Sequence, residues 1–316
     1  MSGLRVIKAG PLSLLQDGGR HGWQHLGVSP SGPMDRHAAA WANRLLENAP
    51  TAPLLEIALG GVELESLGDT WLALCGAELP IQLDGVVRSN WSRFRMRAGQ
   101  RLRLGFARSG QRAYLAIAGG FRVEPVLGSV ACQAREGLGG LDGRGARLAD
   151  GDLLPGGGDL LPGGGGQFAR GASVPWPWQP DYRAERPLRV MLGGDAALFT
   201  PSDVQAFFAQ PWQLSPQSDR MGARLKGEPL SPPKRQWSLG VVRGTVQVPP
   251  DGQPIILQAD HQTMGGYPIL GWLHPRDCDR LAQCSAHQTL RFEPVDIPTA
   301  QADLRQFRRF FEPAKP

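Results

Sequence analysis

Short apolar runs separated by turn residues occupy most of the first half of the chain. The runs are 54–59, 71–74, 81–83, 101–104 and 112–118, and the turns between them include Gly60-Gly61, Gly68-Asp69 and Asp84-Gly85. Strands this short, at this spacing, are typical of a barrel or a sandwich. The pattern therefore predicts a mainly β fold with a few helices.

Helical periodicity is limited to three segments. In the first, Met34, Ala38, Trp41 and Leu45 form an apolar stripe. The sequence Ser31-Gly32-Pro33 before it predicts a helix start, with Asp35 in the first turn, where the helix dipole favours an anion. The other two segments are 195–209 and the C-terminal 299–311.

The length of 316 residues suggests two domains. Leu188-Arg189-Val190 echoes Leu4-Arg5-Val6, so we predict that the second half repeats the order of the first. The first domain is expected over 1–180, ending in a Gly/Pro-rich loop and linker, and the second over 181–316 with a C-terminal helix. Residues 152–158 (DLLPGGG) recur at 159–165. This tandem copy predicts a loop duplication, because it lacks the strand-to-helix context and the lysine of a P-loop.

Charge and cysteine content exclude several classes of function. The net charge is +5, but the basic residues are scattered without a stripe of interleaved aromatics, which argues against nucleic-acid binding. The four cysteines show no CxxC motif and no metal-ligand spacing with histidine. The chain has neither a signal-peptide pattern nor an apolar run of about 18 residues. We therefore expect a cytoplasmic protein that binds no membrane and no dedicated metal.

Polar residues crowd between two apolar strands in the second half. The strand 255–257 is followed by Gln258, Asp260, His261, Gln262 and Thr263, then by Gly265-Gly266 and a second strand at 269–273. Polar groups at the ends of two buried strands predict that they face a groove. The alternative is an ordinary polar hairpin.

Several ordered blocks resemble one protein family over nearly the whole chain. They include 31–35 (SGPMD), 112–115 with 118–120, 218–222 (SDRMG), and Thr263 with 265–268. The family is that of the C subunit of bacterial ATP-dependent 5-oxoprolinase, also described as allophanate hydrolase subunit 2-like or biotin-dependent carboxyltransferase-like. The resemblance implies two tandem cyclophilin-like β-barrel domains, a B subunit as obligate partner and a separate A subunit.

The activity that the resemblance implies is the conversion of 5-oxo-L-proline to L-glutamate. Phosphorylation of the lactam carbonyl oxygen would activate the lactam for attack by water. The phosphate would come from ATP, bound with magnesium at a site shared with the partner subunit. The sequence departs from the family pattern at Val130-Ala131-Cys132, where small hydroxyl residues are usual, and at Ala286-His287-Gln288, which replace a Gly-Asp turn.

The groove hypothesis assigns roles to eight residues. Arg220 is a forked donor for carboxylate or phosphate oxygens, and Asp219 or Asp260 is a base or a magnesium ligand. The expected substrate-binding residues are Gln258, Thr263, Tyr267, Arg20 and Asp35. The structural alternative is that Arg220 and Asp219 form a buried ion pair that ties a loop.

Two other functions stay open at this point. One is a carboxyltransferase module that passes a carboxyl group from carboxybiotin to a urea-like amide; its biotin would sit on another chain, since no Met-Lys-Met-like segment exists here. The other is a non-enzymatic regulator that binds a kinase-inhibitor partner.

Overall fold

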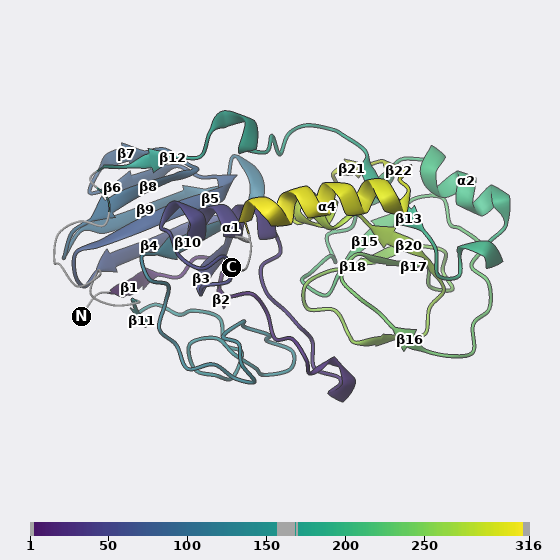
Figure 1. Cartoon of the computed structure of the whole chain (residues 1–316), viewed down its shortest axis with the longest axis horizontal. Coiled ribbons are helices and arrows are strands. Elements are labelled where there is room, and N and C mark those ends of the chain that lie inside the picture. The colour runs from purple at the N-terminus through teal and green to yellow at the C-terminus, as the bar shows by residue number, and fades with distance from the viewer. Residues whose placement is uncertain (1–2, 157–167, 169, 312–316) are drawn as a thin grey trace. The chain divides into compact units, whose positions relative to one another are not determined.

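The chain divides into two compact units, Met1–His21 with Ser31–Arg183, and Gly22–Pro30 with Ala184–Pro316 (Figure 1). The computed structural model describes residues 3–156, 168 and 170–311. Within these residues it has 22 strands and four α-helices, so the prediction of a mainly β fold with a few helices is confirmed.

The first unit consists of two six-stranded antiparallel sheets. One sheet has the order β11 (Leu153–Pro155), β1 (Gly3–Lys8), β4 (Gly60–Ser66), β9 (Arg101–Phe106), β6 (Ile81–Leu83) and β7 (Val86–Arg88). The other has the order β12 (Ala172–Ser173), β8 (Ser92–Met96), β5 (Thr70–Glu78), β10 (Ser109–Ile117), β3 (Leu54–Ala58) and β2 (Leu12–Gln16). The chain crosses repeatedly between the sheets, for example from β1 to β2 and from β7 to β8.

Alternation of side chains places the core of the first unit between these sheets. In β4, Val62 and Leu64 are buried, whereas Glu63 and Glu65 lie on the more exposed face. Strand β5 is instead buried along nearly its whole length. The reason is that helix α1 (Arg36–Leu45) packs on β5, β8 and β10.

Helix α1 starts later than the sequence suggested. Its N-cap is Asp35, whose Oδ1 accepts a hydrogen bond of 2.9 Å from the backbone N–H of Ala38. Ser31 has a φ of 58° and Gly32 a φ of 95°, so neither residue has the backbone conformation of a helix start. Asp35 is therefore the cap itself and does not lie within the first turn.

The second unit is built on one eight-stranded sheet. Its order is β21 (Thr289–Leu290), β14 (Trp212–Leu214), β15 (Gly222–Lys226), β18 (Ile255–Leu257), β17 (Thr245–Gln247), β20 (Ile269–Leu273), β13 (Leu188–Leu192) and β22 (Phe292–Pro294). The two end strands, β21 and β22, are separated by Arg291 alone. One short segment thus supplies both edges, and the sheet curls into a nearly closed barrel. A separate pair, β16 (Leu239–Gly240) with β19 (Met264–Gly265), completes the strands.

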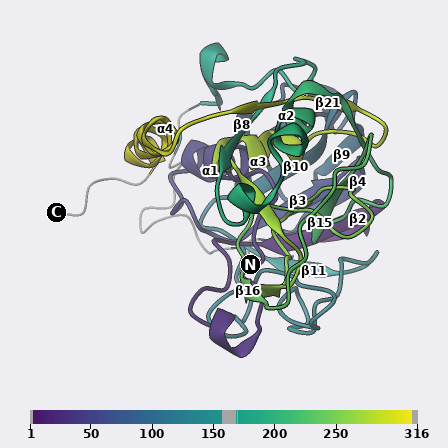
Figure 2. The ribbon, with the colours of Figure 1, turned by 90° about the vertical axis from the view of Figure 1, so that its right-hand side faces the viewer.

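Three α-helices belong to this unit: α2 (Pro201–Ala209), α3 (Pro275–Leu281) and α4 (Ile297–Phe311). The C-terminal helix was predicted at 299–311 and is confirmed; Figure 2 views it end-on. The helix predicted at 195–209 is interrupted, because Thr200 caps α2 by accepting from Asp203 N–H, and a 3-10 turn (Ala196–Leu198) precedes it.

Two further expectations concern the loop repeat and membranes. The tandem copy at 159–165 lies outside the described residues, and the first copy supplies β11. Among the described residues, no helix combines the length and the apolar character needed to cross a membrane.

Candidate functional site

Strands β15 and β18 bring Arg220 and Asp260 together. The strands pair with Gly222 opposite Leu257, and the pairing continues past their ends, where Asp260 N–H donates to Arg220 O (2.8 Å). The two side chains, 40 residues apart in sequence, then meet through two hydrogen bonds: Arg220 Nε to Asp260 Oδ2 and Nη2 to Oδ1, each 2.8 Å. Both residues are buried. The guanidinium and carboxylate therefore form a two-pronged ion pair at the end of β18.

Asp219 has a different role from the one the sequence suggested. Its Oδ1 accepts hydrogen bonds from the backbone N–H groups of Met221 (2.8 Å) and Gly222 (3.0 Å), and the residue is exposed. Asp219 therefore shapes the turn before β15. The expected ion pair of Arg220 exists, but its partner is Asp260, because the register of β15 and β18 brings Asp260 to that side chain.

Two buried glutamines lie near this pair in the sheet, Gln247 at the end of β17 and Gln258 directly after β18. Gln258 and Gln247 are each only 1% exposed. Among the described residues, the Oε1 of Gln258 and the Nε2 of Gln247 have no hydrogen-bond partner. Gln247 Oε1 accepts a long bond of 3.4 Å from Gln262 Nε2. Each of these two amide groups therefore has one buried hydrogen-bonding atom without a partner in the described part of the chain.

Gln247 was not among the sequence-predicted site residues. Its signal was a polar residue at the end of a buried strand, before Val248-Pro249, but such a residue is also common in turns. The pair β16–β19 lies directly over it: a Cβ at Gly265 would be 2.3 Å from Gln247 Nε2. A side chain at position 265 would therefore displace the glutamine.

Thr263 and Tyr267 lie on either side of β19. Thr263 is half-buried, and its carbonyl accepts from Val241 N–H (3.0 Å). Tyr267 is exposed, and its carbonyl accepts from Arg235 Nη1 (3.0 Å). The described hydrogen bonds of both residues use their backbone oxygen, so neither side chain is held by a described hydrogen bond.

Arg20 lies in the first unit and is fully buried. Its guanidinium donates to the carbonyls of Val126 (2.9 Å), Ser129 (3.2 Å) and Ala131 (3.0 Å). Asp17 binds the same loop by accepting from Val130 N–H (2.8 Å). Arg20 thus clamps the loop that contains the departure from the family pattern at 130–132.

Asp35, also in the first unit, is part of a second buried network. Besides capping α1, its Oδ2 accepts from the hydroxyl of Tyr182 (2.8 Å), and its N–H donates to the hydroxyl of Tyr114 (2.7 Å). Tyr114 in turn donates to Glu56 Oε2 (2.9 Å). Burial, and then the neighbouring carboxylates, raise the pKa of both tyrosines, so both stay protonated donors.

Of the eight predicted residues, two lie in the first unit, Arg20 and Asp35, and six in the second, Arg220, Asp219, Asp260, Gln258, Thr263 and Tyr267. Arg220, Asp260 and Gln258 are gathered at the ends of β15 and β18. Arg20 and Asp35 hold separate networks in the first unit, with contacts that fix a loop and a helix start.

Both carboxylates that the sequence suggested as magnesium ligands already have partners. Within 3–156, 168 and 170–311, no group of three histidine, cysteine, aspartate or glutamate side chains is placed to hold a metal ion. Asp260 is bound to Arg220, and Asp219 to backbone N–H groups.

Comparison with known proteins gives consistent matches. A family profile described as carboxyltransferase domain, subdomain A and B, matches residues 26–294. The C subunit of 5-oxoprolinase from Escherichia coli (strain K12) is 39% identical over 98% of this chain and 96% of the relative. The protein of the same name from Haemophilus influenzae is 35% identical over 92% of this chain and 91% of the relative.

A solved structure shows the same fold within a longer protein. The urea carboxylase of Kluyveromyces lactis superposes with a TM-score of 0.85 at 26% identity, covering 99% of this chain. This chain spans only 29% of that protein.

Proposed function

The chain belongs to the family of carboxyltransferase domains with subdomains A and B, and from that premise we propose that it is the C subunit of an ATP-dependent 5-oxoprolinase. With the A and B subunits it would convert 5-oxo-L-proline to L-glutamate. The observation that carries this proposal is the alignment, nearly end to end for both chains, with two relatives named as the C subunit of 5-oxoprolinase.

The substrate of this reaction is a cyclic amide, whose resonance makes its carbonyl a poor electrophile. A lactam presents one N–H donor and one carbonyl acceptor. In our proposal Gln258 Oε1 accepts from the lactam N–H, and Gln247 Nε2 donates to an oxygen of the substrate, since neither atom has another partner among the described residues. Thr263 and Tyr267 contribute side-chain contacts from the accessible side.

The ion pair has a positioning role in this proposal. By fixing the end of β18, Arg220 and Asp260 hold the backbone from which Gln258 projects. In the proposal, ATP and its magnesium ion are bound together with residues of the partner subunit.

A second candidate is a carboxyltransferase half-reaction on a urea-like amide. Its support is the fold shared with the Kluyveromyces lactis urea carboxylase. The same two glutamines would suit a urea-like acceptor, and the biotin would arrive on another chain.

The test is reconstitution with the A and B subunits of the same organism. We expect glutamate formation that requires 5-oxoproline, ATP and all three chains, and none from this chain alone. Carboxyl transfer from carboxybiotin to urea, without 5-oxoproline turnover, would favour the second candidate. Turnover of 5-oxoproline by the purified chain alone would contradict the division of the site among subunits, and a stable complex without either activity would favour a regulatory protein.

A further inference from the structure

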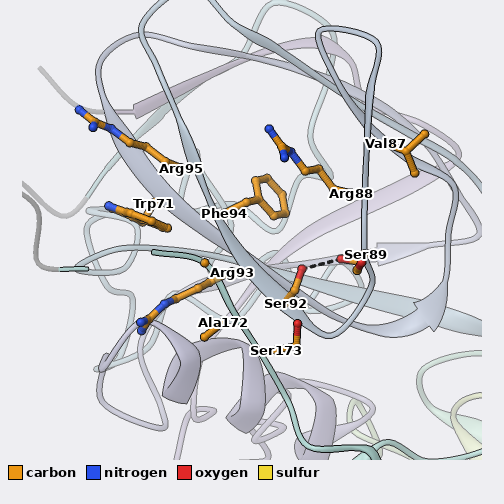
Figure 3. Close-up of a pocket in the computed structure, with 11 residues that line it drawn as sticks. Trp71, Val87, Arg88, Ser89, Ser92, Arg93, Phe94, Arg95, Ala172 and Ser173 are labelled. Carbon is orange, nitrogen blue, oxygen red and sulfur yellow. Dashed lines mark hydrogen bonds between the residues drawn. The ribbon is translucent and has the colours of Figure 1, made fainter. Parts of the chain in front are cut away.

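A cavity of about 590 Å³ opens in the first unit at the crossing from β7 to β8. It lies between β7 on one sheet and β8 with β12 on the other, and Val87, Arg88, Arg93, Arg95 and Ser173 are among its lining residues (Figure 3). None of the predicted site residues lines it.

The lining carries three arginines and no acidic residue. Arg95 is paired with Asp69 at the surface (2.7 Å, both about half exposed), and Arg93 donates to Leu45 O (2.8 Å) and stacks 3.7 Å over the Phe168 ring. The guanidinium of Arg88 makes no ion pair or hydrogen bond within the described part of the chain, and its Nε is buried. A partly buried cation without a counter-charge favours an anionic ligand.

The side chains of Arg88, Arg93 and Arg95 point in different directions (Figure 3). This arrangement suits several separate carboxylates better than a single compact anion such as phosphate. Acidic side chains spaced along an extended chain can provide them, because successive residues of a strand are about 3.3 Å apart.

Among the described residues, the outer edge of strand β7 pairs with no other strand. β7 is the end strand of its sheet and pairs with β6 through the two-residue turn Asp84-Gly85, with Val86 opposite Leu83 and Val87 opposite Gln82. Both turn residues have positive φ (46° and 81°), as in a tight type I′ hairpin. The pair that flanks such a turn is hydrogen-bonded, so the next pair is not, and the N–H and C=O of Val87 point away from β6.

The side chains of this edge are also apolar and exposed. Val86 is 55% and Val87 is 73% exposed. Edges in soluble proteins are protected by short strands, charged side chains, proline or bulges. Strand β7 is short (3 residues, Val86–Arg88) and contains no proline, and its single charged residue is Arg88.

We propose that β7 and the adjoining arginine cavity bind an acidic, extended segment of a partner subunit. The segment adds a strand to β7 through the backbone of Val87, and its carboxylates face Arg88 and Arg95. The inference rests on the proposed function in one respect, the existence of a partner subunit in a stable complex.

The test compares dissociation constants of the complex formed by the full chain and its co-expressed partner subunit, at low and at high salt. Arg88→Glu replaces attraction by repulsion, and we expect affinity to fall at least about tenfold at low salt and less at high salt. The matched control is Arg122→Glu, the same charge change at an exposed arginine of the first unit that does not line the cavity.

The backbone contact has its own pair of variants. Val87→Pro removes the outward N–H without breaking the hairpin with β6, and we expect affinity to fall about five- to tenfold, as for the loss of one hydrogen bond. Val87→Thr keeps the N–H and is expected to bind like the original chain. Melting temperatures of the isolated variants show whether each one folds.

The outcomes separate this inference from the proposed function. A complex whose affinity is unchanged by both Arg88→Glu and Val87→Pro overturns the docking site alone. Absence of any complex between the unaltered chains overturns the proposed multi-subunit function, and the docking site with it.

Discussion

Arg220 and Asp260 join the ends of β15 and β18 through two hydrogen bonds of 2.8 Å inside the second unit. Breaking one partner of such a buried pair leaves the other charge uncompensated, which is more costly than losing a surface ion pair. The pair therefore stabilises the second unit and also fixes the position of the residues at the end of β18.

Arg220→Lys is expected to destabilise the second unit. Lysine keeps the charge but cannot make the two-pronged contact, and one charged hydrogen bond contributes about 1.5–3 kcal/mol. Chemical unfolding followed by near-UV circular dichroism measures the change. Asp219→Asn is the control, since its Oδ1 still accepts from Met221 and Gly222 and stability should be nearly unchanged. An Arg220→Lys protein with full stability but no activity would instead place Arg220 on the substrate.

Gln258→Met is expected to separate stability from activity. Methionine fills a similar volume and removes a buried oxygen that lacks a partner among the described residues, so stability should stay level or rise by about 1 kcal/mol. If Gln258 binds the lactam N–H, the reconstituted enzyme should lose most of its kcat/KM for 5-oxoproline. The exposed Gln213→Met should change neither. Full activity of Gln258→Met would remove this residue from the substrate site.

Stability of the second unit is expected to fall as pH drops below about 6.5, the ordinary pKa of histidine. Burial, and then the Arg189 guanidinium, lower the pKa of His274 from its ordinary value of 6.5. Its Nδ1 accepts from Arg276 N–H (3.2 Å) and Arg189 Nη2 (3.3 Å), so its Nε2–H donates to Ala300 O (3.2 Å). The unfolded chain then takes up a proton at a pH where the folded chain does not, which favours unfolding in acid.

Melting temperatures between about pH 7 and 5 test this for the original chain and for His274→Asn. Asparagine retains an acceptor for the start of α3 but does not titrate, so the decline with acid should be smaller. The exposed His21→Asn is the control. Burial by itself would raise the pKa of Asp277 and Asp303, but hydrogen bonds from arginines outweigh it and hold both pKa values below 3.8. These two carboxylates therefore stop stabilising the folded state only at a more acidic pH than the range of this measurement. An equal decline in all three proteins would contradict the prediction.

Tyr182→Phe is expected to destabilise the first unit by about 1–3 kcal/mol, because Asp35 loses a hydrogen-bond donor in a buried setting. Thermal unfolding measures the loss. Tyr267→Phe removes a hydroxyl from an exposed tyrosine and should leave stability nearly unchanged. Equal melting temperatures for both variants would show that the Tyr182–Asp35 bond is not stabilising.

The local pattern of the sequence determined the strands and much of the helix content. The apolar runs 54–59 and 71–74 marked β3 and β5, the turn Asp84-Gly85 marked the end of β6, and the stripe from Ala38 to Leu45 marked α1. These features depend on neighbours a few residues apart, so propensity and periodicity suffice to predict them. The family motifs added the function class, and the comparisons confirm the family.

The tertiary structure decided which polar residues meet. Asp260 binds Arg220 because the register of β15 and β18 aligns residues 40 positions apart. Asp219 instead accepts hydrogen bonds from the backbone of its own turn. Asp35 caps α1 because Ser31 and Gly32 have positive φ, and Arg20 is buried because a loop more than a hundred residues later supplies its acceptors. The cavity beside β7 likewise arises only where two sheets end together. Such contacts are set by long-range register and packing, which no local stretch of sequence encodes by itself.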